Sequence, residues 1–569
     1  MTTSLGSYKY FPLGSDDTIR VVEIAPSPDP DAPIECTLLL RRLSEDEPEY
    51  EALSYTWGDA ADRVSITVTA ASCASIMVTM NCFNALRSLR TPDKARTMWV
   101  DAICINQDDL SERSAQVRMM FDIFFRASRT MVYLGEETTE SEIVFNELIE
   151  AAPLPRNFKA LSGGHVVHRA RPRPNSELAL ALEALLRRPW FQRVWVLQEV
   201  YASERPWVMC GPRAAPWDTF QDFTLGYTGT KITRDELPFS VFVYGPAYTS
   251  PWDRLFKLLA NTQPSLATDP RDKVLALKAF LGQGRDQLDP FIDYSMPVED
   301  LYQKVAEKLL QCLGSRVLSA IRHPHNRTMP SWAPDWSRYY PLRGLFPFYD
   351  SSDLCPSSVG WPQWDSTLPP STSVFRTLEL QGRLLGPITE LGDTVSLGNY
   401  DDAKRRLYNI IEHLGPILDD QDSKDSTICT PRLPFPAGFL AARSVAQYWS
   451  PFRWTKFLTR CFLVFDKEES CMDYENWTAM YQSLDHCRVV VIGDEFVGIA
   501  PEQAVMSDLV YTIKGGTQAC ILRPAPNNMF RLISGDCYVE HMDGMQLDSM
   551  LDEEDKYFEG REFEKLIIC

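Results

Sequence analysis

The chain alternates short apolar runs with amphipathic segments between residues 50 and 135. Three runs have the length and apolar character of buried strands: residues 50–57, 98–105 and 130–135. The segment before the third run carries four apolar residues at the spacing of one helix face: Val117, Met120, Phe121 and Phe124. A strand, a helix and another strand in close succession predict parallel strands with a right-handed crossover. We therefore expect an α/β fold whose parallel sheet is buried on both faces.

Weaker patterns divide the rest of the chain. Two β-branched runs, at 64–68 and 75–80, predict a hairpin inserted after the first strand, and Asn81 is placed to cap the helix that follows. Apolar residues at helical spacing predict three more helices: 177–188, 269–281 and 295–313. Four runs near the carboxyl terminus predict antiparallel strands separated by turns: 489–501, 508–516, 517–525 and 530–540.

These patterns predict four regions: a β extension at 1–48, the α/β domain at 49–211, a helical region at 212–345 and a mainly β region at 346–569. An acidic, proline-rich run predicts a flexible insertion near 415–440. The aromatic motif MPSWAPDWS, at 329–337, is expected to pack between domains.

Composition and charge narrow the classes of partner. The 569 residues are 44% hydrophobic and 11% aromatic, which is enough apolar material for a large core. Lys and Arg total 57 against 77 Asp and Glu, and the net charge of −20 opposes attraction to nucleic-acid phosphates or anionic lipid. No signal-peptide pattern or membrane-length apolar run is found, and the 14 cysteines form no CxxC pair. We therefore expect a cytoplasmic protein that binds no nucleic acid and has no membrane span.

Polar residues follow the predicted strands, in three places: Trp57 to Asp59, Cys104 to Asp108, and Gly135 to Glu137. The ligand crevice of an open parallel sheet forms outside the carboxyl ends of its strands. Asp101 lies inside the second apolar run, where a carboxylate costs several kcal/mol unless it is paired. It needs an arginine such as Arg113 or Arg193, backbone donors, or a ligand.

Two pairs of residues after the second run have both a structural and a ligand-binding interpretation. Asn106 and Gln107 either cap the following helix or line a site at the strand end. Glu112 and Gln116 are four residues apart on the face opposite the apolar one. Such a pair is typical of a solvated helix face, but these two lie close to the strand end.

Glu199 is the third candidate, because it lies in the strongly apolar run RPWFQRVWVLQEV. A carboxyl group against apolar surface has a raised pKa, as catalytic carboxyls often do. Aromatic neighbours such as Trp195 can stack on a nucleobase or a nicotinamide ring. The structural alternative is a core helix in which Glu199 pairs with Arg193.

Other chemistries find less support in the sequence. No histidine precedes His165, so the first strand ends have no local His for a nucleophilic dyad. The HVVH and HPH motifs, at 165–168 and 323–325, lack the Cys or carboxylate partners of a metal site. No GxxxxGK[ST] loop occurs, and GQG at 282–284 lacks the third glycine of a dinucleotide fingerprint.

Three blocks resemble, in order and spacing, the characteristic blocks of the fungal heterokaryon incompatibility (HET) domain: YEALSYTWGD, WVDAICINQDDLSERSAQVRMMFDIFFRASRTMVYLG and RPWFQRVWVLQEV. Three later stretches resemble the extended architecture of single-chain HET proteins: 267–281, 329–337 and 533–544. The resemblance spans most of the chain, with its functional content in residues 50–210.

The HET resemblance implies a role in nonself recognition, in which the domain triggers programmed cell death of fused fungal cells. HET domains are distantly similar to TIR domains, whose flavodoxin-like fold agrees with the expected parallel sheet. Some TIR domains hydrolyse NAD with a glutamate in a W-x-x-x-E-like pattern. This likeness implies Glu199, after Trp195, as the catalytic carboxylate, with NAD as a substrate and no bound cofactor.

Two hypotheses follow. In the first, the protein is a TIR-like NAD glycohydrolase with Glu199 catalytic, no metal, and seven substrate-binding residues: Trp57, Asp101, Asn106, Gln107, Glu112, Arg193 and Trp195. In the second, it is a signalling scaffold that acts by self-association or by recruiting an unknown incompatibility partner. A pocket that holds Glu199 favours the first hypothesis, and a flat exposed patch favours the second.

Overall fold

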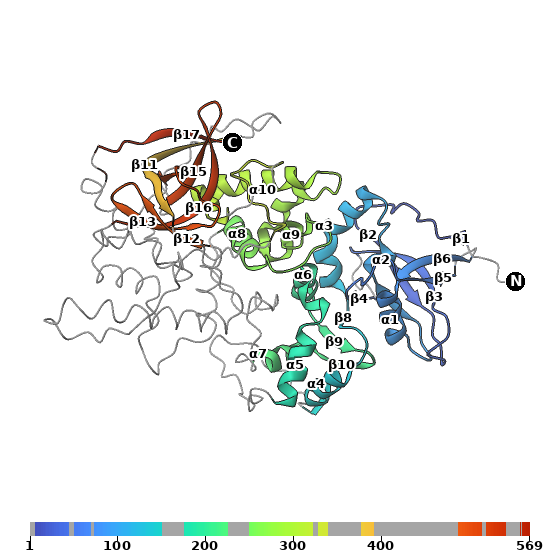
Figure 1. Cartoon of the computed structure of the whole chain (residues 1–569). Coiled ribbons are helices and arrows are strands. Elements are labelled where there is room, and N and C mark those ends of the chain that lie inside the picture. Colours follow the sequence, from blue (N-terminus) through green and yellow to red (C-terminus); the bar gives the residue numbers. More distant parts are fainter. Residues whose placement is uncertain are drawn as a thin grey trace. The chain divides into compact units, whose positions relative to one another are not determined.

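The structure is a computed structural model that describes these ranges of the chain: 6–44, 50–69, 73–150, 176–225, 250–321, 328–338, 377–391, 487–514, 519–541, 558 and 560–569. The chain forms two compact units, Met1–Val298 and Glu299–Cys569 (Figure 1). The division lies inside the segment 212–345 that the sequence pattern presents as one helical region.

The first unit is built on a mixed ten-stranded sheet. Its strands, in spatial order, are β1 (Gly6–Ser7), β6 (Ala74–Thr79), β5 (Arg63–Val68), β3 (Glu35–Arg42), β2 (Thr18–Ile24), β7 (Arg96–Trp99), β4 (Glu51–Ser54), β8 (Thr130–Tyr133), β9 (Pro206–Cys210) and β10 (Arg213–Pro216).

Four adjacent strands of this sheet, β7, β4, β8 and β9, are parallel. Along the chain, β4 is the first strand of this group, β7 the second, β8 the third and β9 the fourth. Their order in space is therefore second, first, third, fourth. Every residue of β4 and β8 is buried, because helices cover both faces of a parallel sheet. The expected parallel α/β core is therefore present.

The amino-terminal extension belongs to the same sheet. β2 pairs antiparallel with β3 on one side and with β7 on the other, where Val22 lies opposite Met98. β5 and β6 form the predicted antiparallel hairpin, and β5 pairs with β3. The sheet is mixed because the extension and the hairpin add antiparallel strands beside the parallel group.

The helices of the first unit are α1 (Met80–Leu89), α2 (Asp101–Cys104), α3 (Leu110–Arg126), α4 (Thr139–Glu150), α5 (Glu177–Leu186), the 3₁₀ helix η1 (Pro189–Gln192), α6 (Trp195–Ala202), α7 (Trp217–Leu225), α8 (Pro251–Asn261), α9 (Asp272–Leu275) and the kinked 3₁₀ segment η4 (Lys278–Phe291). Short polar side chains cap several of them, with Asp109 accepting from two backbone N–H groups of α3 and Ser176 from one of α5.

The run 98–105 is not one strand, which corrects the sequence interpretation of Asp101. β7 ends at Trp99, and the next residues turn into α2 because the Cys104 N–H donates to the carbonyl of Val100 at 2.7 Å. Asp101 is the first residue of that short helix rather than a strand residue. Its carboxylate therefore lies beyond the sheet edge, where the buried-strand penalty does not apply.

Three other local predictions are wrong. Gln116 is fully buried and donates to the carbonyl of Thr18 at 3.1 Å, so its helix face packs on the sheet instead of facing solvent. The cap of α1 is Thr79, while Asn81 bonds to Thr56. The helix predicted from residue 269 begins at Asp272.

The second unit contains α10 (Val298–Leu313), the 3₁₀ helix η5 (Gly314–Ala320) and a seven-stranded sheet. The strand order is β12 (Cys487–Ile492), β13 (Phe496–Pro501), β16 (Met529–His541), β15 (Ala519–Ala525), β14 (Leu509–Ile513), β11 (Leu378–Leu391) and β17 (Glu564–Ile568). β12 also pairs with β11, which brings the first strand of the sheet back to its far side. The predicted antiparallel pairings of β14 with β15 and of β15 with β16 are confirmed, whereas the predicted strand 489–501 forms two strands, β12 and β13, that pair with each other.

The aromatic motif at 329–337 joins the helical and β parts of the second unit. The Ser331 hydroxyl accepts from the Leu532 N–H of β16 at 2.9 Å, and the Trp336 ring lies edge-on to Tyr302 of α10 at 5.2 Å. The two histidine motifs and the insertion near 415–440 lie outside the described residues. Among the helices of the described ranges, none is long and apolar enough to cross a membrane.

Candidate functional site

The candidate site lies where β4 and β7 end, next to the helix that carries Glu199. Ser54 is the last residue of β4, and α2 begins two residues after β7. The residues that follow parallel strands gather at one edge of the sheet, which is the usual position of a ligand crevice in open α/β folds.

A directed chain of hydrogen bonds reaches Glu199 from the core. The Trp190 indole N–H donates to the Ser54 hydroxyl at 2.9 Å, and that hydroxyl donates to Oε2 of Glu199. Because an indole N–H only donates, the single proton of Ser54 is committed to the carboxylate. No other hydrogen bond from the described residues reaches Glu199, which is 4% exposed.

Burial raises the pKa of Glu199 to about 7, which places its titration near neutrality. The Arg193 guanidinium and the Ser54 hydroxyl act against this rise, whereas the Asp101 carboxylate adds to it. Arg193 donates to the carbonyl of Tyr55, the residue after β4. The carboxyl group of Glu199 is therefore poised to exchange a proton at physiological pH.

The segment after residue 260 holds helix α6 in place. The Val194 N–H donates to the carbonyl of Leu266 at 2.9 Å, and the Ala279 N–H donates to Oε1 of Gln198 at 3.3 Å. Trp195 is near the carboxylate of Asp272, whose pKa burial raises to about 6 against the hydrogen bonds from Tyr294 and Trp195. The position of Glu199 thus depends on residues far along the chain.

Trp57 and Asp101 form the exposed side of the site. The Trp57 indole N–H donates to Oδ2 of Asp101 at 2.8 Å, and Oδ1 accepts from the Ala102 N–H at 2.7 Å. Trp57 is 41% exposed. Neither Arg113 nor Arg193 is the hydrogen-bond partner of Asp101, because backbone and indole donors satisfy it.

Glu112, Asn106 and Gln107 stabilise the loop after β7. The Arg20 guanidinium, 2% exposed, contacts both carboxylate oxygens of Glu112, at 2.5 and 3.1 Å. The Asn106 N–H donates to the same carboxylate at 2.7 Å, and the Gln107 amide donates to the carbonyl of Asp101 at 3.0 Å. Asp109, rather than Asn106 or Gln107, caps α3.

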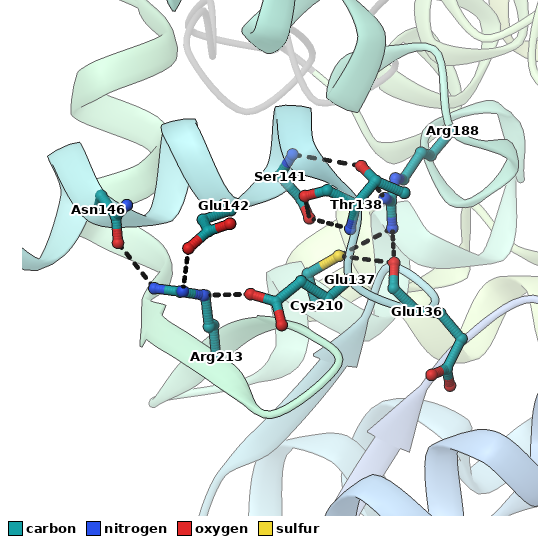
Figure 2. Close-up of polar contacts among 9 residues, drawn as sticks. All are labelled: Glu136, Glu137, Thr138, Ser141, Glu142, Asn146, Arg188, Cys210 and Arg213. Atoms are coloured by element: carbon teal, nitrogen blue, oxygen red, sulfur yellow. Dashed lines mark hydrogen bonds and ion pairs between the residues drawn. The ribbon is translucent and has the colours of Figure 1, made fainter.

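The third polar strand end, beyond β8 and β9, is a network of matched contacts (Figure 2). The Arg188 guanidinium donates to the carbonyls of Leu134 and Glu136, at 3.0 and 2.9 Å. Arg213 bonds to Glu137, to Glu142 at 2.7 Å and to Asn146 at 2.7 Å (Figure 2). These contacts tie the loop after β8 to β10 and α4.

An open depression of about 220 Å³ lies at the loop after β4. Its lining is polar and consists of Gly58, Asp59, Asp62, Met80, Asn81 and Asn84. Glu199 is not among these lining residues. Within the ranges that the structure describes, no three His, Cys, Asp or Glu side chains are placed to hold a metal ion.

Of the residues that sequence reasoning singled out, Trp57 is hydrogen-bonded to Asp101, and the charges of Asp101 and Arg193 act on Glu199. Trp195 lies toward Asp272; Asn106 and Gln107 belong to the loop after β7, and Glu112 of α3 bonds to that loop. Sequence reasoning missed Ser54 and Arg20, whereas it treated Trp190 only as an aromatic neighbour of Glu199 and Asp272 only as a residue of a first helical turn. An arginine within the buried strand at residues 18–24 was the one available signal, because a buried cation requires a partner.

Comparisons with known proteins agree with the motifs. The model of the family "Heterokaryon incompatibility protein (HET)" matches residues 50–199. A curated relative from Neurospora crassa, heterokaryon incompatibility protein 6, OR allele, is 25% identical over 472 residues, which cover 68% of this chain and 67% of that protein. No solved structure matches the chain significantly. Residues 50–199 are therefore a heterokaryon incompatibility (HET) domain, in a chain that is similar to a fungal heterokaryon incompatibility protein.

Proposed function

We propose that the protein acts in fungal nonself recognition and that its HET domain triggers cell death by cleaving NAD. The family match and the Neurospora relative support the first part. The second part rests on one observation: a buried carboxyl group with a pKa near 7, Glu199, at the carboxyl end of the central parallel strand β4.

The strand order is consistent with a TIR-like arrangement. The parallel strands occur in the order second, first, third, fourth, which is the order of flavodoxin-like sheets. In such sheets the ligand lies outside the ends of the first and third strands, which here are β4 and β8. Ser54 ends the first of these strands and donates to Glu199.

The proposed reaction is hydrolysis of the ribose–nicotinamide bond. The carbon–nitrogen bond breaks and its electron pair leaves with nicotinamide, so that the ring becomes neutral. Water forms the new carbon–oxygen bond at the ribose and gives its proton to the ionised Glu199. The negative carboxylate also stabilises the positive charge that develops on the ribose in an oxocarbenium-like transition state.

The test is NAD consumption by the purified full-length protein, measured dilute and artificially clustered. We expect turnover by the wild type and a loss of about 10²- to 10⁴-fold in Glu199→Gln. Glu51→Gln is the matched control, since Glu51 is also a buried glutamate but lies at the opposite end of β4, paired with Arg96 and Arg129. Its specific activity per folded molecule should equal that of the wild type.

The scaffold function is the second candidate, and the accessibility of the site favours it. The depression beside the β4 loop does not include Glu199, whereas Trp57 is exposed at the same edge. If the wild-type protein consumes no NAD, either dilute or clustered, while its expression still kills cells, the enzymatic proposal is wrong. The scaffold function then takes its place.

A further inference from the structure

Trp57 is an exposed aromatic residue whose polar atom already has a partner. Its indole N–H donates to the Asp101 carboxylate at 2.8 Å, while 41% of the residue is exposed. What Trp57 offers to a ligand is therefore its aromatic ring and not an unmet donor. An exposed tryptophan ring beside a carboxylate is a surface on which a planar ligand can stack.

The loop that carries Trp57 is held on both sides. The Asn81 amide donates to the Thr56 carbonyl and to the Thr56 hydroxyl, the latter at 2.9 Å. Arg193 donates to the carbonyl of Tyr55. Gly58 has φ of 78°, and a Cβ there would lie 3.2 Å from that of Asn81, so this turn requires glycine. The ring is thus preorganised, which lowers the entropic cost of binding to it.

The charges around Trp57 favour a cation. A carboxylate that accepts from the indole N–H increases the electron density of the ring, and tryptophan is the aromatic side chain that binds cations best. Asp101, which accepts from the indole N–H of Trp57, also interacts electrostatically with Glu199, and the Arg193 guanidinium acts on the same carboxyl group with the opposite sign. With Glu199 ionised, these three groups sum to one negative charge.

We propose that Trp57 is a stacking surface for a planar cationic ring of the N-alkylpyridinium class, and that Asp101 sets its preference for the charged ring. The inference rests on the proposed function for the identity of the natural ligand, since the nicotinamide ring of oxidised NAD is such a cation. Neutral rings, including the reduced nicotinamide, bind this surface more weakly because they lack the charge.

The test uses 1-methylnicotinamide as the cationic probe and nicotinamide as its neutral counterpart. Binding to the full-length wild-type protein is measured by calorimetry, because neither probe contains the ribose–nicotinamide bond and so neither can be turned over. We expect the cation to bind about 5- to 30-fold more tightly than the neutral ring. Trp57→Leu should abolish that difference, and Trp57→Phe should reduce it.

Asp101→Asn separates charge from geometry, because an asparagine oxygen can still accept from the indole N–H. It should weaken binding of the cation and leave that of nicotinamide unchanged. Phe125→Leu is the matched control: Phe125 is an exposed aromatic residue on α3 that stacks on Phe121. This variant should bind both probes as the wild type does.

The outcomes separate this inference from the proposed function. Charge-selective binding that depends on Trp57, with no NAD cleavage by the wild type, supports the inference and removes the proposed reaction. Cleavage that depends on Glu199, with equal affinity for both probes or no effect of Trp57→Leu, overturns the inference and leaves the reaction standing. Failure of both probes to bind also overturns it.

Discussion

Two polar clusters lie at the carboxyl ends of neighbouring parallel strands, and they differ in how fully their charged groups are paired. Beyond β8 and β9, Arg188 and Arg213 are matched to carbonyls and carboxylates (Figure 2). At the end of β4, Glu199 is buried with one hydrogen-bond donor, and the carboxylate of Asp101 raises its pKa further.

The difference indicates which strand end serves the fold and which is available for chemistry. A network whose charges are matched gains stability from those contacts and has little to offer a ligand. A buried carboxyl group whose ionised form is poorly compensated costs stability, so its presence calls for another reason. The loop after β7 resembles the matched cluster, because Arg20 and Glu112 neutralise each other.

The largest effect on stability is expected from Arg20. Arg20→Met leaves the Glu112 carboxylate buried without its cation, and we expect a loss of about 3–5 kcal/mol in the free energy of unfolding. Urea denaturation of the full-length chain measures it. The double variant Arg20→Met with Glu112→Leu should recover most of the loss, since the lone carboxylate is gone. A loss below about 1 kcal/mol would place this pair among ordinary surface ion pairs.

The next effect is the pH dependence of the free energy of unfolding, which should be stronger for the cluster at β4 than for the cluster beyond β8 and β9. The native protein keeps the Glu199 proton between about pH 4.5 and pH 7, where the unfolded chain has already lost it. Stability therefore falls as pH rises through this window, by about 3 kcal/mol in total. Glu199→Gln should remove that fall.

Denaturation curves of wild type and Glu199→Gln at about pH 4.5 and pH 8 measure this difference. Asp272, whose pKa is also raised, gives a slope of the same sign in both proteins, so subtracting the two curves isolates Glu199. Equal slopes in the two proteins would mean that Glu199 is solvated, and the contrast between the clusters would disappear.

A smaller effect is expected from Arg188, at the matched cluster. Arg188→Met removes the donors to the Leu134 and Glu136 carbonyls and should cost about 1–3 kcal/mol. NAD turnover per folded molecule should not change, since the loop after β8 is structural in this comparison. Thermal denaturation and the turnover assay are run side by side. A loss of turnover as large as that of Glu199→Gln would instead make this loop part of the site.

Arg213 should have the smallest effect. Its acidic partners Glu137 and Glu142 are 34% and 50% exposed, so solvent and salt screen the interactions. We expect Arg213→Gln to lower Tm by no more than about 2 °C, and the shift to vanish in about 1 M salt. A larger shift that persists in high salt would show that the outer edge of the cluster is more deeply buried than its exposure indicates.

Local patterns in the sequence were sufficient for much of the fold. Strongly periodic segments such as α3 and α5, and the hairpin of β5 and β6, form where the hydrophobic spacing predicts them. Errors occurred where two signals competed. The apolar run through Asp101 has the composition of a strand, yet it turns into α2 after Trp99, and Gln116 has a polar side chain on a face that packs against the sheet.

The features of the candidate site likewise fall into those that the sequence predicts and those that only the structure reveals. By itself the sequence determined the HET motifs, the apolar surroundings of Glu199 and the polar strand ends, because these depend on neighbouring residues. Only the tertiary structure decided which polar residues are compensated. Arg20 reaches Glu112 across 92 positions and Ser54 reaches Glu199 across 145, and such pairings follow from strand order and helix packing, which no local pattern encodes.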